Sequence, residues 1–313
     1  MKPAIWIFIC ALILTGCSTQ SGTEERAAVP ETVIYTEAFT ENMETETGTE
    51  SELISEPQTA ETDWSGYFNG VNGTAVIYDA SAMQYTLYNR DLASARRSPC
   101  STFKIISSVI ALENNILEPA ASTRPWSGER FWNEDWNRDI DFSEAFRTSC
   151  VWYYRQLVDD IGKDLMQKEL DRLQYGNCDI SDWEGRSNTN NQNRALTGFW
   201  LESSLIISPR EQVAVMERIF GDHSEYSAET QKELKQVMLV SDLEETDISI
   251  YGKTGMGKVA GIVVDAWYTG FAQSPEGDLY FCVRLDRTDG KDVSSSLAKE
   301  IAIKIVSDHY HDR

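Results

Sequence analysis

The sequence predicts an α+β domain, in which an antiparallel β-sheet is flanked by helices and carries a helical subdomain. Strand-like segments occur early in the folded region, at residues 73–79 and 85–89, and late, at residues 262–272 and 279–286. Segments with helical spacing fill most of the interval between these pairs. Strands at both ends of a domain with helices between them are typical of this class.

Composition and turns identify the strands. Residues 73–79 read Gly-Thr-Ala-Val-Ile-Tyr-Asp, and a short turn separates them from residues 85–89. Runs of β-branched and aromatic residues of this length favour strands. The late pair is separated by the turn-forming residues Ser274 to Asp278, which predicts a hairpin.

Four helices are predicted. After Pro99, apolar residues recur at helical spacing as far as Ile110. The others are expected at residues 143–161, at residues 209–220 with Ser208 as the N-terminal cap, and at residues 294–309, where a helix closes the domain.

Residues 1–16 have the pattern of a secretory signal. Lys2 precedes an apolar run from Ile5 to Leu14, which is too short to cross a bilayer comfortably. The sequence from Leu14 to Cys17, Leu-Thr-Gly-Cys, resembles a bacterial lipobox. We therefore expect a lipid on Cys17 and a membrane-anchored, extracytoplasmic protein. Cleavage of an ordinary signal nearby is the alternative.

Residues 17–63 are predicted to form a disordered acidic tether, and residues 64–313 one folded domain. Between Ser18 and Asp63, Arg26 is the only basic residue. Such a stretch cannot bury enough apolar surface to offset the entropy of ordering. The formal net charge of −22 excludes nucleic acid as an expected partner, because phosphate binding needs clustered Lys and Arg.

Histidine-based and metal-based catalysis are not expected. The chain has three histidines, at positions 223, 309 and 311, and none belongs to an HxxxH or HExxH pattern. A Ser-His-Asp triad and a zinc hydrolase site are therefore improbable, and no metal is expected. A hydrolase with this sequence needs another base.

Four cysteines lie beyond the leader and form no CxxC pair, which argues against a redox motif. They are Cys100, Cys150, Cys178 and Cys282. Two interpretations stay open: buried thiols, or a local disulfide.

Ser101 and Lys104 offer the missing base. Residues three apart on a helix lie on one face, and a serine hydroxyl becomes a nucleophile when a neighbour takes its proton. Burial of Lys104 would favour its neutral amine, which can add carbon dioxide. Ser296 and Lys299 have the same SxxK spacing, but no other motif lies near them, so we interpret that pair as structural.

Further motifs follow Ser101 in a defined order. They are Ser149-Cys150-Val151 after Trp136, Tyr175-Gly176-Asn177, Trp200 within FWLESS, and Lys253-Thr254-Gly255 entering a strand. The combination of SxxK and KTG is typical of β-lactamases and penicillin-binding proteins. The full set, from Gly73 to the closing helix, resembles the class D β-lactamases, the oxacillinase group.

This resemblance implies hydrolysis of a small β-lactam substrate and assigns the catalytic residues. Ser101 would be acylated, and Lys104 would be carboxylated by carbon dioxide, with no other cofactor. Ser149 would shuttle a proton to the leaving nitrogen. Trp200 would donate a hydrogen bond to the lysine carbamate.

The resemblance also assigns residues to substrate binding. Lys253 and Thr254, followed by Gly255, would bind the substrate carboxylate. The backbone N–H groups of Ser101 and Met256 would form the oxyanion hole. Val151 and Tyr175 would line the site, and packing alone is an equally good explanation for Tyr175.

One position departs from the family. An arginine of the closing helix binds the substrate carboxylate in much of the class, and Ala298 stands in its place here. Arg284, Arg287 and Lys291 are the candidates to replace it.

Three other functions compete with a β-lactamase. A β-lactam sensor would acylate without fast turnover, and a penicillin-binding peptidase would share SxxK and KTG but more often has SxN as its middle motif. A solute-binding lipoprotein would explain the leader and leave Ser101 and Lys104 unexplained. The sequence indicates no oligomeric state.

Overall fold

The computed structural model describes residues 56–243, 247–288 and 290–311. Within them, seven strands form one sheet in the order β1-β3-β2-β7-β6-β5-β4. The strands are β1 (Gln58–Glu61), β2 (Gly73–Asp79), β3 (Gln84–Tyr88), β4 (Leu239–Leu243), β5 (Ile248–Val259), β6 (Ile262–Ser274) and β7 (Gly277–Asp286). The predicted early pair and late hairpin are confirmed, and β7 pairs with β2, so both ends of the domain share one sheet.

The sheet is mixed, because β1 runs parallel to β3 while the other neighbouring pairs are antiparallel. β1 lies in the segment that the sequence assigns to the tether, so the folded part begins before the predicted boundary at Trp64. Three of its four residues are exposed and backbone pairing holds it at the sheet edge, so it leaves no apolar pattern in the sequence. The predicted signal, Cys17 and most of the predicted tether lie outside the described residues.

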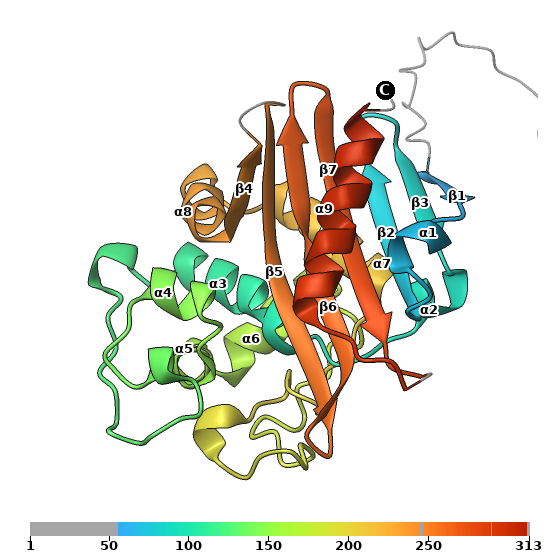
Figure 1. Ribbon diagram of the computed structural model, residues 1–313. Helices are drawn as coiled ribbons and strands as arrows, with labels where there is room; N and C mark the ends of the chain where they lie inside the picture. The colour runs from blue at the N-terminus through green and yellow to red at the C-terminus, as the bar shows by residue number, and fades with distance from the viewer. Residues whose placement is uncertain (1–55, 244–246, 289, 312–313) are drawn as a thin grey trace, which may run out of the picture. The chain divides into compact units, whose positions relative to one another are not determined.

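Helices cover both faces of the sheet. α1 (Ser65–Phe68) and the closing helix α9 (Ser295–His311) lie on one face, where α9 crosses the strands in Figure 1. Ile301 and Ile305 of α9 pack there with Phe68 and Ile77. α7 (Pro209–Phe220) lies on the other face, and the predicted cap is confirmed, because Ser208 and Glu211 form a capping box.

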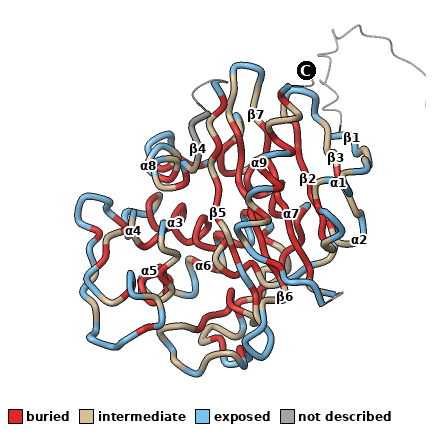
Figure 2. Tube along the Cα trace, in the orientation of Figure 1, coloured by how far each residue is buried: buried red, intermediate tan, exposed pale blue. Residues whose placement is uncertain are grey.

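The helical subdomain lies beside β5 (Figure 1). Its helices are α3 (Lys104–Glu113), α4 (Phe142–Arg147), α5 (Val151–Ile161), α6 (Lys163–Leu173) and α8 (Ala228–Met238). The 3-10 turn η1 (Cys100–Phe103) leads into α3, which is buried along almost its whole length, as Figure 2 shows. A helix that is buried on all sides has little freedom to move, so the residues at its start are firmly held.

The prediction of one helix over residues 143–161 is wrong. The chain forms α4 and α5, separated by a break at residues 148–150, where Ser149 adopts a left-handed backbone conformation with φ 60°. Phe146, Cys150 and Tyr154 are all buried and keep a helical spacing of four across the break. Apolar periodicity therefore hides the interruption. The sequence analysis also missed α6 and α8.

The Tyr175-Gly176-Asn177 motif is a structural turn. The Asn177 backbone N–H donates to the Ile206 carbonyl at 3.0 Å, and the Asn177 side-chain oxygen accepts from the Ile206 N–H at 3.0 Å. Gly176 has φ 57°, and a Cβ there would lie 2.0 Å from the Ile206 carbonyl oxygen. Glycine is required because both the conformation and the close approach exclude a side chain.

Gly176→Ala should therefore destabilise the domain by more than the cost of a left-handed backbone alone, which is about 1 kcal/mol. We expect a loss of at least ~2–3 kcal/mol in urea unfolding, because the backbone must also move away from Ile206. Gly128→Ala is the matched control, since Gly128 has φ 85° and no atom within 4 Å of its virtual Cβ. Equal losses in the two variants would contradict the close-approach argument.

Candidate active site

Most of the sequence motifs converge on one pocket of about 430 Å³. It lies between η1, the turn joining α4 to α5, β5, and the loop that contains residues 188–202. The predicted site residues that line it are Ser101, Ser149, Val151, Thr254, Gly255 and Met256. Lys104, Lys253 and Trp200 are buried beneath the surface of the protein and are not part of this lining.

The predicted nucleophile and base are in contact. The Lys104 Nζ lies 3.1 Å from the Ser101 Oγ, and the lysine side chain is buried. Ser101 belongs to η1 and Lys104 opens α3, so the three-residue spacing puts both groups on one side of the turn. Cys100, directly before the serine, has φ 49°, and strain of this kind is common at functional sites.

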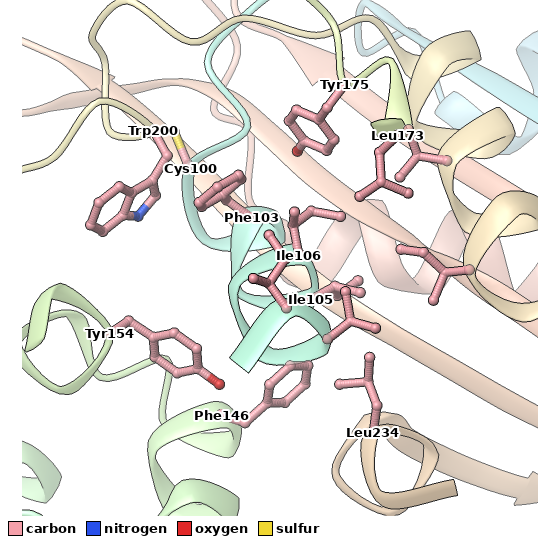
Figure 3. Close-up of a cluster of buried hydrophobic side chains, with 14 of the residues drawn as sticks. Cys100, Phe103, Ile105, Ile106, Phe146, Tyr154, Leu173, Tyr175, Trp200 and Leu234 are labelled. Atoms are coloured by element: carbon pink, nitrogen blue, oxygen red, sulfur yellow. The ribbon is translucent and has the colours of Figure 1, made fainter. Parts of the chain in front are cut away.

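Burial lowers the pKa of Lys104 to about 8, so the neutral amine is accessible near neutral pH. Among the described residues, no carboxylate forms an ion pair with it. Its Nζ lies 5.1 Å from the centre of the Tyr154 ring. Figure 3 shows Tyr154, Phe103 and Trp200 grouped around the start of α3. The Trp200 Nε1 is buried and has no hydrogen-bond partner in the described part of the chain.

A second lysine, Lys253, contacts the hydroxyl groups of Ser149 and Thr254. The Lys253 Nζ donates to the Ser149 Oγ at 3.1 Å and to the Thr254 Oγ1 at 3.3 Å. Burial, reinforced by repulsion from Lys104, lowers the pKa of Lys253 well below its usual value. Trp136 supports the Ser149 turn by donating its Nε1–H to the Thr148 carbonyl at 3.1 Å.

Gly255 allows β5 to lie directly against η1. A Cβ at this position would stand 3.0 Å from the Pro99 carbonyl oxygen and 3.1 Å from a Thr102 methyl carbon. The Lys-Thr-Gly motif lies in the middle of β5, not at its entrance, with Gly255 paired to Trp267 of β6. The strand therefore brings Thr254 and Met256 to the pocket that contains Ser101.

Val151 and Tyr175, which were both predicted to line the site, differ in their positions. Val151 lines the pocket, whereas Tyr175 is buried, does not line it, and packs edge-on against Phe103 with ring centres 5.6 Å apart. The packing explanation therefore fits Tyr175 and the lining role does not. Ser296 is exposed on α9 and does not line the pocket, in keeping with its structural interpretation.

None of the three candidate replacements for the missing arginine lines the pocket. Arg284 is buried in an ion pair with Asp286 at 3.0 Å. Arg287 pairs with Asp292 at 2.7 Å, and Lys291 donates to the Gly70 carbonyl. Ala298 is itself buried in the core.

Glu202 is a pocket residue that the sequence analysis missed. Its Oε1 accepts from the Lys258 N–H at 2.9 Å, its Oε2 accepts from the Asn188 side chain at 3.0 Å, and its own N–H donates to the Ser98 Oγ at 2.9 Å. Burial raises the pKa of its carboxyl group. Glu202 thus joins β5 to the turn before Ser101, and its place two residues after Trp200 in FWLESS was the available signal.

The four described cysteines are all free thiols, and Cys100, Cys150 and Cys282 are buried. Burial raises the pKa of Cys150 to about 11 and that of Cys282 to about 12. Both thiols therefore stay protonated at neutral pH and act as small packing groups.

Comparison with known proteins places the chain in a family. The model of the penicillin binding protein transpeptidase domain matches residues 43–307. The probable β-lactamase YbxI of Bacillus subtilis is 32% identical over 240 residues, which cover 76% of this chain and 81% of YbxI. The crystal structure of a class D β-lactamase from Bacillus subtilis superimposes with a TM-score of 0.68 at 30% identity, covering 79% of this chain and 95% of that one.

A regulatory protein belongs to the same group of relatives. BlaR1 of Bacillus licheniformis is 29% identical over 247 residues, which cover 78% of this chain and 38% of BlaR1. The present chain therefore spans little more than a third of that relative's length. The matched family model and the fold agree: the chain belongs to the penicillin-binding protein transpeptidase family and, within it, is a relative of the class D β-lactamases.

Proposed function

We propose that this protein hydrolyses β-lactam antibiotics through an acyl-enzyme on Ser101. The observation that carries the proposal is the 3.1 Å contact between the Ser101 Oγ and the buried Lys104 Nζ at the edge of an open pocket. The relationship to YbxI and to the class D enzyme structure supports it.

Acylation follows from the contacts of the site. Neutral Lys104 takes the hydroxyl proton of Ser101, and the Oγ attacks the lactam carbonyl carbon. The N–H groups of Ser101 and Met256 would stabilise the oxyanion that forms in this step. The ring C–N bond then breaks, and the nitrogen takes a proton from Ser149, which Lys253 replenishes across their 3.1 Å contact.

Deacylation uses the same part of the site, around Lys104. Water adds to the ester carbonyl while a base at Lys104 takes its proton, and the Ser101 oxygen leaves and is reprotonated. The products are the ring-opened acid and the free serine. The charged Lys104 cannot act as this base, so activity should rise with pH as the ammonium loses its proton near pH 8.

The residues around Lys104 fit its carboxylation by carbon dioxide. A carbamate at this position would supply an anionic oxygen base in place of the amine. The buried Trp200 Nε1, which has no partner among the described residues, would hold it with one hydrogen bond. Lys104 itself has no competing carboxylate partner in that part of the chain.

A sensor of β-lactams is the second candidate, because BlaR1 is a relative of comparable identity. Both functions need the acylation step, and they differ in whether water then releases the product. No helix in the described part of the chain is long and apolar enough to span a bilayer. Nitrocefin separates the two: many turnovers indicate an enzyme, and a single stoichiometric burst indicates a sensor.

Ser101→Ala should abolish nitrocefin hydrolysis, with a loss of at least about 10³-fold in kcat, because Ser101 carries the hydroxyl that contacts the Lys104 Nζ. The urea midpoint should stay near that of the wild type. Ser296→Ala, which alters the second SxxK sequence, is the control and should keep full activity. A variant at Ser101 that still turns over would show that the nucleophile is misassigned.

Labelled bicarbonate should give a carbon-13 carbamate signal in the wild type and none in Lys104→Ala. Trp200→Phe keeps a ring next to Phe103 but removes the N–H donor. A hydrogen bond to a charged acceptor contributes roughly 1.5–3 kcal/mol, so carboxylation should weaken by about ten- to a hundredfold. Added bicarbonate should then restore the signal and part of the turnover. A fully active wild type without this signal would leave Lys104 as a free amine base.

We also propose that the protein is held outside the cytoplasm by a lipid on Cys17. The support is the short apolar run that ends in Leu-Thr-Gly-Cys. A single acyl chain binds membranes only weakly, so a diacylated cysteine is needed for stable anchoring.

Mass spectrometry of the mature protein should find a diacylated N-terminal Cys17. Cys17→Ser should release the protein into the soluble fraction and leave nitrocefin turnover per molecule unchanged. An unmodified N-terminus at another residue would remove this proposal and leave an ordinary secreted protein.

A further inference from the structure

Arg155, in the middle of α5, carries a buried charge that the proposed mechanism does not use. Its side chain is 2% exposed, and arginine is almost never fully buried unless it is paired. The guanidinium forms an ion pair with Asp159, four residues further along α5, and its Nη1 donates to the Trp183 carbonyl at 2.9 Å. A buried ion pair is weak evidence for stability, because an apolar side chain of similar size avoids the cost of desolvation. The charge at this position therefore needs another explanation.

The Arg155 guanidinium lies over two indole rings. Its Cζ is 5.3 Å from the centre of the Trp183 ring and 5.5 Å from the centre of the Trp200 ring. Both distances are within the range of a cation–π contact, which is stronger in a buried site than in an exposed one. Trp200, the expected hydrogen-bond donor to a carbamate on Lys104, is therefore in contact with a buried positive charge.

A chain of ion pairs fixes the plane of this guanidinium. Asp159 accepts from both the Nε and the Nη2 of Arg155, with the Nε at 3.3 Å. Asp159 also accepts from the Arg194 Nη1 at 2.8 Å, and Arg194 pairs with Glu184 at 2.6 Å. A bidentate contact between a guanidinium and a carboxylate sets the orientation of the planar group. Arg155 therefore presents a fixed flat surface to the Trp200 ring.

The Trp200 ring is restrained by a second neighbour as well. Phe103 stacks on the indole with ring centres 5.8 Å apart and an angle of 24° between the planes. The Trp200 Nε1 is buried and has no partner among the described residues, and Figure 3 shows this nitrogen on the edge of the ring that faces the start of α3. A donor that is already oriented loses little freedom when its acceptor forms, so its hydrogen bond is stronger.

We infer that Arg155 is a positioning residue for Trp200, and that its contact with the indole strengthens the carboxylation of Lys104. In that step the Lys104 nitrogen bonds to the carbon of carbon dioxide and releases one proton to water, which leaves an anionic carbamate. The inference rests on the proposed function and deepens it, because Arg155 does not line the catalytic pocket.

Carbon-13 NMR with labelled bicarbonate, without any β-lactam, tests the inference near pH 8, where neutral Lys104 is present. Arg155→Met keeps a long side chain and removes the charge and the planar group. The bicarbonate concentration that gives half of the maximal carbamate signal should rise roughly five- to tenfold, as expected for the loss of one buried cation–π contact. Trp200→Phe should cause a larger rise, because it removes the N–H itself. Arg155→Gln, which keeps an N–H donor, is the second variant and should show the same rise if Arg155→Met does not fold.

Two controls separate positioning from a purely structural role. Arg194→Met breaks the ion pairs with Asp159 and Glu184 but leaves the contact between Arg155 and Trp200 in place. It should shift the half-maximal bicarbonate concentration less than about twofold. In the Trp200→Phe background, Arg155→Met should have little further effect, because the N–H through which Arg155 acts is already absent.

Three results would each show that Arg155 does not act through the Trp200 N–H. They are an unchanged bicarbonate dependence in both Arg155 variants, an equal shift in Arg194→Met, and additive shifts in the double variant. A wild type that turns over nitrocefin without a carbamate signal would also overturn the inference, and it would leave the hydrolase function intact. A carboxylated wild type that turns over no nitrocefin would contradict the proposed hydrolysis, and the carbamate measurements would still decide the role of Arg155.

Discussion

The structure depends on the burial of two lysines that have no carboxylate partner among the described residues. Lys104 and Lys253 are both almost fully excluded from water, and each contacts a serine hydroxyl, Ser101 or Ser149, at 3.1 Å. Keeping both ammonium groups charged would lower the stability of the folded state, because buried charges lose their hydration. Burial therefore lowers the pKa of each, and their mutual repulsion lowers that of Lys253 further. The site spends folding stability to keep an amine that can accept a proton near neutral pH.

The surrounding scaffold makes this cost tolerable by fixing the segments that carry the lysines. Gly255 lets β5 lie against η1, and the Cys100 N–H donates to the Trp200 carbonyl at 3.0 Å. Glu202 then links the same loop to β5 through the Lys258 N–H. Cys100, which precedes Ser101, and Ser149 both have left-handed backbone conformations, so the two catalytic serines lie at sharp turns. Packing by the neighbouring segments holds these conformations, which an isolated chain would avoid.

The sequence was a good guide where chemistry or periodicity leaves a local mark. Both strand pairs, the capped helix after Ser208 and the Ser101–Lys104 pair are examples, and the motifs carried the family resemblance. It failed where long-range packing decides. The break at Ser149 interrupts a continuous apolar pattern, and β1 is held by backbone pairing.

The two lysines also connect substrate recognition to activation of the base. Without an anion, repulsion and burial disfavour a proton on Lys253. A carboxylate beside Thr254 would stabilise the charged form of Lys253, because opposite charges in a site of low dielectric attract strongly. A charged Lys253 in turn repels a proton on Lys104 and so favours the neutral amine that faces Ser101. The substrate's own charge would thus prepare the nucleophile that attacks it, and a neutral molecule of the same shape would bind without this effect.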